Sequence, residues 1–589
     1  MIADHFLVSQ SRRPRLRIGV LLDDLSLPRC FAEVIDHIQK SNFATIELVI
    51  IHVQANASPV PRHRSKWLVL WDLLSDPKRR ANLGFAIYQN LDHQYFLGVN
   101  DPLALVDCRE ALSGIESIKI RPRETGFVHR FDPSDIEEIR NRNLDVILRF
   151  GFNILKGDVL TVARHGIWSY HHGDNEYYRG GPPYFWELYE ESKLSGVTLQ
   201  VLTEDLDAGY VLAKAKFSTV QGSLSTIQNR FTPYWGVTHL VIQKLWQLHN
   251  YGWEYLEKRS IPNKPYQGMR KIYRTPKNWE LLKWLVPSLA GKIVRRLARL
   301  ASPDKIALWR LALRLRSQRL LYQTGDVDGS TFKWLTPPRG HFHADPFLIE
   351  HDGRTWMFFE DYIYAESKAA IVCREVLQSG EVGEIRTVLK RPYHLSYPFV
   401  FKHDANYYLI PESASNGTVE LYRATDFPHK WVLEKVLYRG KAVDTTVYFD
   451  SGTFWFFTTL QAPAGDGMCL CLFHSDRIDG EWQWHPSNPV SMDVQDSRCG
   501  GRVFRQGRML VRVSQDCSGR YGSSFSFREI LTLTKTDYKE ILLQTVAPWS
   551  ESFSGTHTYD YCSKIEVIDG VIYVPKSSHL VPAELPPEN

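Results

Sequence analysis

The stretch "LDVILRFGFNILKGDVLTVARHGIWSYHH", residues 144–172, decides the fold of the first part of the chain. Residues 144–151 form a short apolar run typical of a buried strand, residues 157–165 predict a short helix, and residues 166–172 predict a second strand. A strand, a helix and a strand in this order are the building unit of a parallel sheet covered by helices. Ligands of such sheets bind at the carboxyl ends of the strands, where this stretch ends in two histidines.

The residues before this stretch continue the same alternation. Residues 15–22 (RLRIGVLL) and 46–53 (IELVIIHV) are continuous apolar runs, as expected for parallel strands buried on both faces. Helices are predicted over residues 30–40 and 132–143. Together these elements predict a doubly wound α/β domain over residues 1–220.

Residues 221–330 change to a helical and basic pattern. Apolar residues occur at helical spacing, and residues 292–319 are rich in Lys and Arg with a single acid. One interpretation is a pair of helices that lies on an anionic membrane through residues 284–319. The other is a basic helical connector between domains, which we favour because Pro287 and Pro303 divide the segment into short pieces.

Residues 331–589 contain an internal repeat with a turn residue in each copy. The first strands of the copies start at Asp345, Tyr397, Asp444, Cys499 and Cys562, and the turns fall at Gly353, Ala405, Gly452, Gly507 and Gly570. The five copies are ADPFLIEHDGRTWMFFE (344–360), SYPFVFKHDANYYLIPE (396–412), VDTTVYFDSGTFWFFTT (443–459), RCGGRVFRQGRMLVRVS (498–514) and YCSKIEVIDGVIYVPK (561–576). Five strand–turn–strand copies about 50 residues apart predict an all-β five-bladed propeller over residues 331–589.

Composition limits the classes of protein that the chain can belong to. It has 589 residues, of which 43% are hydrophobic and 23% charged, as expected for a multidomain globular protein. A net charge of +5 does not indicate a nucleic-acid partner, and none is predicted. The sequence has no run of 18 apolar residues, and its eight cysteines show no zinc-binding spacing. These features predict a cytoplasmic protein with reduced thiols, either free or peripheral to the inner face of the membrane.

The histidines at the end of the opening stretch are the first candidates for chemistry. Adjacent residues on a strand point to opposite faces, so His171 and His172 cannot easily share one ion, and no metal site is predicted. His171 and Asp207 follow neighbouring strands and can meet in one cleft, where the carboxylate would orient the imidazole and accept a proton. A structural histidine and a turn aspartate remain the alternative from spacing alone.

The order of motifs in this region resembles the catalytic segment of the folate-dependent formyltransferases. "SYHHGDNEYYRG", "SGVTLQ" and "EDLDAG" follow one another as that family's Asn-x-His, basic-Gly, Gly-Val-Thr and Asp-x-Gly motifs do, and the resemblance covers about residues 15–220. It implies that His171 and Asp207 are catalytic, and that an amine attacks the formyl group of 10-formyltetrahydrofolate. It implies cofactor contacts at Phe152, Asn153, Ile154, Leu155, Thr203, Glu204, Asp205 and Leu206, and substrate contacts at Arg179, Gly180, Gly181, Tyr184 and Trp186.

Ser169 departs from the family pattern, which has asparagine at this position as a donor to the developing oxyanion. A serine hydroxyl has a shorter reach than an amide, and loss of one such donor costs on the order of a hundredfold in rate. Three interpretations stay open. Ser169 or the nearby Asn175 replaces the donor, the acyl donor differs, or the domain binds without catalysing.

The predicted propeller resembles those of glycoside hydrolase family 43 and of the plant glucosamine inositolphosphorylceramide transferases. The resemblance implies that Asp345 is the base and Asp444 a second acid, both facing a central channel together with Tyr397. The expected glutamate of the fourth blade is absent, and Glu412 or Glu360 is the candidate general acid. The alternative, which we favour, is a propeller that binds a glycan and cleaves nothing.

Both resemblances together predict a two-module enzyme of surface glycan synthesis. The first module would formylate the amino group of a nucleotide- or lipid-linked amino sugar, and the propeller would hold the glycan. A second hypothesis places the chemistry in the propeller, beside a degenerate formyltransferase module. A third is a non-catalytic glycan-binding scaffold. An enzyme acting on methionyl-tRNA is disfavoured, because those relatives carry a small C-terminal β-barrel.

Overall fold

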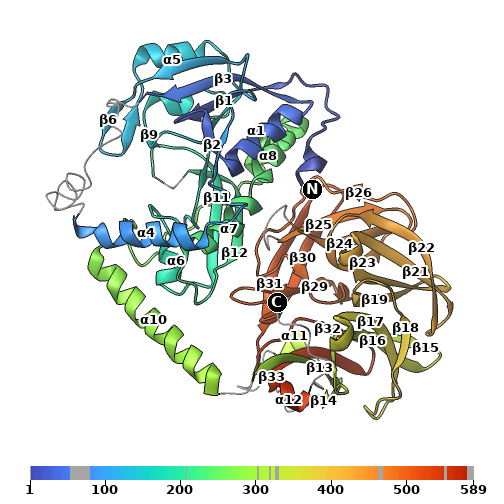
Figure 1. Ribbon diagram of the computed structural model, residues 1–589. Coiled ribbons are helices and arrows are strands. Elements are labelled where there is room, and N and C mark those ends of the chain that lie inside the picture. Colours follow the sequence, from blue (N-terminus) through green and yellow to red (C-terminus); the bar gives the residue numbers. More distant parts are fainter. Residues whose placement is uncertain are drawn as a thin grey trace. The chain divides into compact units, whose positions relative to one another are not determined.

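The computed structural model describes residues 2–53, 80–206, 209–301, 304–316, 320–324, 331–461, 468–549 and 553–579 (Figure 1). The chain divides into two compact units, the first over residues 1–292 and the second over residues 293–461 and 468–589. The chain is therefore multidomain, and each unit is described by itself.

The first unit is built on a seven-stranded Rossmann-like sheet with the order β12-β11-β10-β8-β1-β3-β5. Five of its strands run parallel: β1 (Leu16–Leu22), β3 (Ala44–His52), β5 (Glu116–Ile120), β8 (Val146–Arg149) and β10 (Ile167–His171). β11 (Leu194–Val201) and β12 (Tyr210–Ser218) add an antiparallel hairpin at the edge beside β10. The sheet is mixed because the connection between β11 and β12 is too short for a crossover helix.

Helices and short strands complete the first unit. The predicted helix at 157–165 is only a 3-10 turn, Asp158–Thr161. The helices are α1 (Arg29–Lys40), α4 (Leu83–Phe96), α5 (Pro133–Arg140), α6 (Trp186–Tyr189), α7 (Thr226–Gly236), α8 (His239–Tyr251) and α9 (Trp253–Lys258). The short strands are β2 (Ser26–Pro28), β4 (Leu105–Asp107), β6 (Arg123–Thr125), β7 (Val128–Arg130) and β9 (Ile154–Leu155).

The helices that follow residue 220 pack on the α/β unit. The hydroxyl of Tyr170, on β10, donates to the carbonyl oxygen of Val237 at 2.7 Å, and α8 packs against α1. Leu240, Val241 and Leu245 of α8 are buried. These helices therefore cover the sheet, whereas the sequence pattern placed them in a connector.

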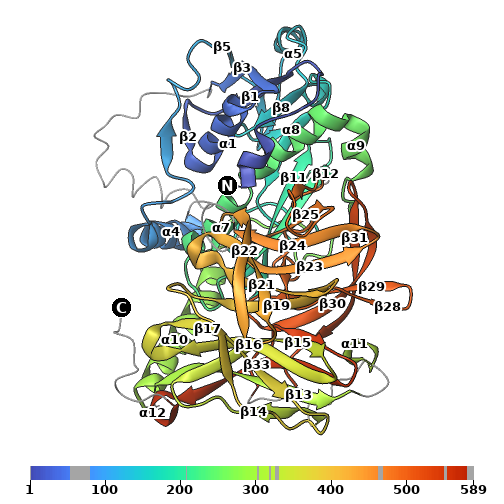
Figure 2. The same cartoon turned by 90° about the vertical axis from the view of Figure 1, so that its right-hand side faces the viewer.

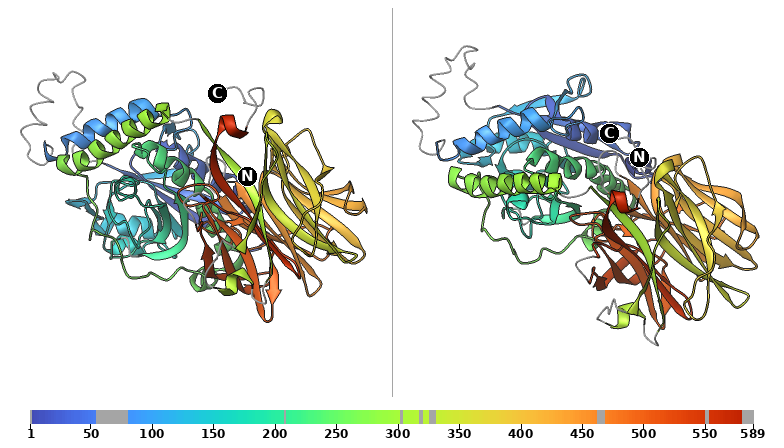
Figure 3. Two further views of the ribbon diagram at one scale, coloured as in Figure 1. Left: turned by 90° about the horizontal axis from the view of Figure 1, so that it is seen from below. Right: turned by 60° about the horizontal axis from the view of Figure 1, so that its bottom comes forward.

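Helix α10 (Asn278–Ala301) is one continuous helix that contains Pro287. Its first turns bury Leu281 and Trp284 against Phe85 and Tyr88 of α4, and Figure 3 shows the two helices side by side. Its later turns expose apolar and basic side chains. Among the described helices, none has the length and hydropathy that a bilayer crossing requires.

The prediction of a second basic helix after α10 is wrong for residues 305–315. This segment is strand β13 (Lys305–Leu315), which pairs antiparallel with β33 (Ile565–Pro575) from Lys305↔Pro575 to Leu315↔Ile565 (Figure 2). Leucine and arginine tolerate both conformations, so pairing with a distant strand decides between them.

The second unit consists of five antiparallel sheets in the described residues. One sheet, β14-β13-β33-β32, joins strands from both ends of the unit, and the other four follow one another along the chain. Their strands are β14 (Lys333–Leu335), β15 (His341–His351), β16 (Arg354–Ile363), β17 (Lys368–Val376), β18 (Arg386–Leu389), β19 (Ser396–His403), β20 (Asn406–Ser413), β21 (Thr418–Asp426), β22 (Lys430–Arg439), β23 (Ala442–Asp450), β24 (Thr453–Gln461), β25 (Met468–Ser475), β26 (Gln483–Trp484), β27 (Arg498–Cys499), β28 (Phe504–Gln506), β29 (Met509–Asp516), β30 (Ser524–Leu533), β31 (Tyr538–Val546) and β32 (Tyr559–Tyr561), with the short helices α11 (Leu321–Thr324) and α12 (Lys576–His579).

The innermost strands of these sheets contact one another in a closed order. β15 contacts β19, β19 contacts β23, β23 contacts β27, and β32 contacts β15. A bridge between Gly501 and Tyr559 joins the fourth sheet to the fifth. We call this arrangement the five-sheet ring.

The repeat matches the structure in four of its five copies. Gly353, Ala405 and Gly452 lie in tight turns between the first and second strands of their sheets, and Gly507 lies in the turn between β28 and β29. The fifth copy was misplaced: β33 runs unbroken through Gly570, and its hairpin turn lies at residues 562–564. The short β32 offers too few residues for the repeat pattern to fix its register.

A β-bulge recurs in the first strands of three sheets. Asp345, Tyr397 and Asp444 have φ values of 54°, 43° and 51°, in the left-handed region that side chains other than glycine rarely adopt. Each stands at a register shift between the first and second strand of its sheet. A bulge re-aims its side chain, so the sequence repeat marks the positions that bend toward the centre of the ring.

The burial of side chains along β13 predicts which substitutions lower the free energy of unfolding. Leu311 is 1% exposed and Leu315 is 54% exposed on the same strand. Leu311→Ala is expected to lower the free energy of unfolding by about 2–5 kcal/mol, because it leaves a cavity in the core. Leu315→Ala is the matched control and should change it by less than about 0.5 kcal/mol. Urea unfolding measures both, and equal effects would contradict the difference in burial between the two leucines.

Candidate functional site

A pocket of about 280 Å³ opens in the first unit, at the carboxyl ends of β8 and β10. Crevices at this edge of a parallel sheet are the usual ligand sites of the fold class. The pocket is lined by Arg149, Ile154, Leu155, Tyr170, His171, His172, Gly180, Pro183, Gln200, Leu202, Thr203, Glu204, Asp205 and Leu206. It thus brings together residues from both predicted cofactor segments and the predicted catalytic histidine. The predicted partner Asp207 lies outside the described residues.

His171 is the last residue of β10 and is held by the loop that follows. Its Nε2 lies 2.7 Å from the carbonyl oxygen of Tyr178, which can only accept, so Nε2 carries a hydrogen. In the neutral ring Nδ1 then bears the lone pair. The loop itself is fixed by Lys214, whose Nζ lies 2.9 Å from Asp174 and 2.6 Å from Glu176.

His172 has a different environment, as the alternation of a strand requires. Its ring stacks on Tyr234 with centroids 3.9 Å apart, and its Nδ1 lies 3.2 Å from the hydroxyl of Tyr184. Burial lowers the pKa of His172 to about 3, so the ring is neutral at physiological pH. The two histidines therefore contact different groups.

Ser169 is buried and contacts Arg149, a residue that the sequence analysis missed. The Nε of Arg149 donates to Ser169 Oγ at 2.9 Å, and Nη1 donates to the carbonyl oxygens of Phe152 at 3.1 Å and Asn153 at 2.9 Å. The guanidinium also lines the pocket. The small serine thus stands beside a fixed cation at the end of the neighbouring strand. Asn175, the other candidate donor, instead donates to Asn263 at 3.0 Å.

Of the predicted cofactor residues, all but Phe152 and Asn153 line the pocket. Ile154, Leu155 and the segment 203–206 line the pocket. Phe152 instead packs its ring against His52, with centroids 4.8 Å apart, and Asn153 contacts the ring of His129. These two residues therefore face a histidine cluster outside the pocket.

The predicted substrate residues also divide. Gly180 lines the pocket, whereas Arg179 donates to the carbonyl oxygen of Asn175 and covers the ring of Tyr266. Gly181 donates its backbone N–H to Tyr273 and accepts from Trp186. Tyr184 and Trp186 are 0% and 2% exposed. Their rings belong to the core and offer no stacking surface, because the helix start packs its aromatic side inward.

Two buried polar groups near the pocket were also missed. Gln200 lies opposite Ser169 on β11, and its Oε1 has no hydrogen-bond partner among the described residues. Glu187, on α6, is 2% exposed, and burial raises its pKa to about 8. It interacts electrostatically with His171.

The five-sheet ring has its own cavity of about 330 Å³. Four acids line it: Asp345 and Asp444 from the bulges, with Glu360 and Glu412 from the second strands of the first two sheets. Its other lining residues are Trp309, Phe342, Ala344, Tyr362, His394, Ser396, Val443, Gln461, Arg498, Tyr521 and His557. Tyr397 is 0% exposed and donates to the carbonyl oxygen of Gly501, so it supports the centre of the ring and does not line the cavity.

The four acids differ in charge. Asp444 accepts a 2.6 Å hydrogen bond from Arg498, which compensates its burial. Burial raises the pKa of Asp345 to about 6 and lifts those of Glu360 and Glu412 well above the ordinary value. Burial therefore favours the protonated forms of the two glutamates. Paired acids whose environments separate their pKa values are typical of general acid and base pairs.

The raised pKa of Glu187 predicts that the free energy of unfolding depends on pH. The folded chain binds this proton more tightly than the unfolded chain, so stability falls as pH rises from the ordinary pKa of 4.5 to the folded value of about 8. Glu187→Gln imitates the protonated acid. It is expected to stabilise the protein on the order of 3 kcal/mol more at pH 8 than at pH 5, measured by urea unfolding. An effect that is the same at both pH values would contradict a raised pKa.

Comparison with known proteins identifies relatives for separate parts of the chain. A family model described as "Glucosamine inositolphosphorylceramide transferase 1, N-terminal" matches residues 336–561, which is less than half of the chain. Glucosamine inositolphosphorylceramide transferase 1 of Oryza sativa subsp. japonica is 35% identical over 215 residues, covering 35% of this chain and 29% of that protein. Methionyl-tRNA formyltransferase of Lachnospira eligens is 33% identical over 86 residues, covering 14% of this chain and 27% of that protein.

Solved structures show weaker likeness. A family 117 glycoside hydrolase produced by the marine bacterium Zobellia galactanivorans is 12% identical with a TM-score of 0.31, covering 46% of this chain and 92% of that chain. A TM-score at this level does not support an argument about fold or function. The chain spans less than a third of the length of both curated relatives, 29% and 27%. Its second unit is similar to one part of the glucosamine inositolphosphorylceramide transferases.

Proposed function

We propose that the first unit transfers a formyl group from 10-formyltetrahydrofolate to the amino group of an amino sugar. The observation that carries this proposal is the pocket at the ends of β8 and β10. It gathers His171, Arg149 and residues from both segments in which the formyltransferase resemblance implies cofactor contacts. These segments are about 50 residues apart in sequence, and the sheet brings them to one edge.

The pocket residues fit a folate. Ile154, Leu155, Leu202 and Leu206 provide apolar walls for a flat ring system. The buried Oε1 of Gln200 lacks a hydrogen-bond partner among the described residues, and a ligand N–H would supply one. When bound, 10-formyltetrahydrofolate supplies the formyl group.

His171 is suited to hold or move a proton at Nδ1. Its Nε2–H is committed to the carbonyl oxygen of Tyr178, which fixes the tautomer and the ring orientation. Asp207, implied by the resemblance, would complete the pair. Glu187 remains protonated at neutral pH and therefore does not compete for the proton.

Arg149 takes the place of the missing asparagine in this proposal. A guanidinium stabilises negative charge on a developing oxyanion more strongly than a neutral amide does. Three hydrogen bonds, to Ser169, Phe152 and Asn153, hold it in place beside the pocket. Serine at position 169 fits this role, because its short side chain leaves room for the arginine and accepts from it.

The five-sheet ring, which we propose is a five-bladed propeller, would hold the glycan that carries the amino sugar. The support is the similarity of residues 336–561 to the N-terminal model of the glucosamine inositolphosphorylceramide transferases. Glucosamine in that name is an amino sugar, the class of acceptor that formyl transfer to nitrogen needs. The whole chain would then act in the synthesis of a surface glycan, on the cytoplasmic side.

His171→Gln tests the proposed activity. Glutamine can still donate to Tyr178 but cannot exchange a proton, so formyl transfer should fall by about 10²–10⁴-fold. The assay follows transfer from 10-formyltetrahydrofolate to nucleotide-linked amino sugars. The matched control is His165→Gln, at a histidine that stacks on Trp253, and it should retain activity.

The second candidate function is carbohydrate chemistry in the ring cavity. The observation that favours it is the set of four acids around one cavity, in which burial raises the pKa values of Asp345, Glu360 and Glu412. The same assays, run with Asp345→Asn, separate the two proposals. Turnover that survives His171→Gln and is lost in Asp345→Asn would favour the ring, and a scaffold without catalysis would show no turnover in any variant.

We also propose that α10 contacts an anionic membrane surface. Val286, Leu289, Ile293 and Leu297 expose 58%, 44%, 60% and 60% of their surface along one side of the helix. Exposed lysine and arginine at 292, 295 and 296 adjoin them. Apolar residues flanked by cations are the features by which interfacial helices bind acidic headgroups.

Vesicle binding tests this contact. The chain is expected to sediment with vesicles of phosphatidylglycerol and phosphatidylcholine, and not with phosphatidylcholine alone. Ile293→Glu combined with Leu297→Glu should abolish binding, whereas Leu433→Glu, at a 50% exposed leucine of β22, should not. Equal binding by all three proteins would rule out α10 as the contact.

A further inference from the structure

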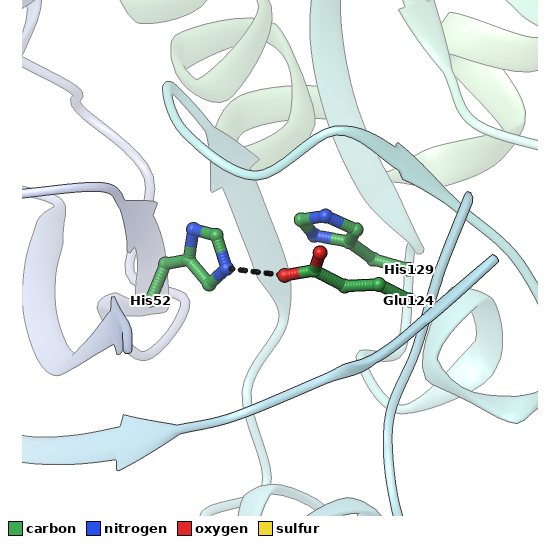
Figure 4. Close-up of side chains that lie close together, drawn as sticks. All are labelled: His52, Glu124 and His129. Carbon is green, nitrogen blue, oxygen red and sulfur yellow. Dashed lines mark ion pairs between the residues drawn. The ribbon is translucent and has the colours of Figure 1, made fainter. Parts of the chain in front are cut away.

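A cluster of two histidines and one glutamate lies in the first unit, outside the pocket. His52 is the last residue of β3, Glu124 belongs to β6, and His129 belongs to β7. One ligand atom from each lies within 4.8 Å of the other two. Figure 4 shows the carboxylate of Glu124 close to both imidazole rings. The three residues form no sequence motif, because they belong to three different strands.

His52 is hydrogen-bonded through Nδ1, whereas its Nε2 makes no hydrogen bond to the described residues and faces Glu124. Its side chain is 7% exposed, and its Nδ1 lies 3.2 Å from Oδ1 of Asp23. The carboxylate can only accept, so it fixes the hydrogen on Nδ1 and leaves the lone pair on Nε2. That Nε2 has no hydrogen-bond partner among the described residues, although it is buried. A buried nitrogen of this kind is costly unless a ligand satisfies it.

His129 is also buried, with 1% of its surface exposed. Its Nδ1 lies 3.4 Å from the backbone nitrogen of Asn153, and its Nε2 lies 3.2 Å from the side-chain nitrogen of Asn153. The backbone N–H of Asn153 donates this long hydrogen bond to Nδ1, and coordination through Nδ1 would replace it. The Nε2–H then faces the side-chain amide of Asn153, whose oxygen accepts after the amide rotates by half a turn.

The spacing between His52 and Glu124 is close to that of two ligands of a tetrahedral cation. Bonds of about 2.0–2.1 Å to nitrogen and oxygen place two ligands of a tetrahedral zinc ion about 3.3 Å apart. The Nε2 of His52 lies 3.7 Å from Oε1 of Glu124, so a shift of a few tenths of an ångström brings them to that distance. Glu124 is 43% exposed and can make this adjustment.

We propose that His52, Glu124 and His129 form a binding site for a divalent transition-metal ion, with Zn²⁺ as the best fit. Two imidazoles and one carboxylate are ligands that zinc accepts, whereas Mg²⁺ and Ca²⁺ prefer oxygen alone. A water molecule completes the fourth position. Asp23 acts as the outer carboxylate that orients His52, a common arrangement around zinc.

The site would tie together the loop that borders the pocket. Asp23 Oδ1 also accepts from the backbone nitrogen of Phe152 at 2.7 Å, and the side-chain amide of Asn153 lies 3.2 Å from Nε2 of His129. The carbonyl oxygens of the same two residues accept from Arg149 in the pocket. The metal therefore has a structural role in fixing this loop, and the proposal does not depend on formyl transfer.

Metal titration tests the site directly. The full chain is stripped with a chelator, exchanged into metal-free buffer and titrated with Zn²⁺ alone by calorimetry, and with Co²⁺ while its visible spectrum is recorded. We expect one tight equivalent of Zn²⁺, a tetrahedral cobalt spectrum and a higher melting temperature of the loaded protein. His129→Gln and Glu124→Gln should remove the tight equivalent, and Asp23→Asn should weaken it by about 10–100-fold.

The control is His165→Gln, which removes a histidine of the same unit and should bind as the wild type does. Circular dichroism checks that each variant folds. Should His129→Gln fail to fold, Glu124→Gln and Asp23→Asn decide the outcome, because both side chains are more than 40% exposed. The proposal is overturned by a wild-type chain without a stoichiometric Zn²⁺ site, or by Glu124→Gln and Asp23→Asn binding with unchanged affinity.

Discussion

The pairing of β13 with β33 is the constraint on which the second unit depends. Its fifth sheet takes β13 and β14 from the start of the unit and β32 and β33 from its end. A closed ring needs such a joint, because an unpaired β33 would expose a row of backbone donors and acceptors along eleven residues. Closure in turn holds the innermost strands together.

Asp345 contacts the sheets on both sides of its own: its carboxylate accepts from the backbone of Tyr397 in the next sheet and from the hydroxyl of Thr558 in the closing sheet. The acids of the cavity are thus positioned by the same contacts that close the ring.

In the first unit the corresponding constraint is the carboxyl edge of the parallel strands. Four neighbouring strands end there in Asp23 (just after β1), His52, Arg149 and His171. The first two belong to the proposed metal cluster and the last two to the pocket. The loop of residues 150–153 lies between them, with Phe152 in a left-handed conformation at φ 62°. Its backbone N–H groups bond to Asp23 and His129, and its carbonyl oxygens bond to Arg149.

The charged side chains of the two cavities have different hydrogen-bond partners. In the ring, Arg498 compensates Asp444, while Glu360 and Glu412 are driven toward their protonated forms by burial. In the pocket, a hydroxyl and two carbonyl oxygens accept hydrogen bonds from Arg149, which hold the guanidinium at the end of β8.

The sequence by itself determined the parallel α/β elements, the position of His171 at a strand end, and four copies of the ring repeat. These features depend on local apolar periodicity and turn residues. It placed Ile154, Leu155 and residues 203–206 at one site, as the pocket has them. Only the tertiary structure decided that residues 305–315 form a strand, since β33 lies about 250 residues away and supplies the partner. It also decided that Tyr184 and Trp186 belong to the core, and that Phe152 and Asn153 face His52 and His129. Sequence motifs did not predict Arg149 or the cluster of His52, Glu124 and His129, because side chains from separate strands meet only when the sheet folds.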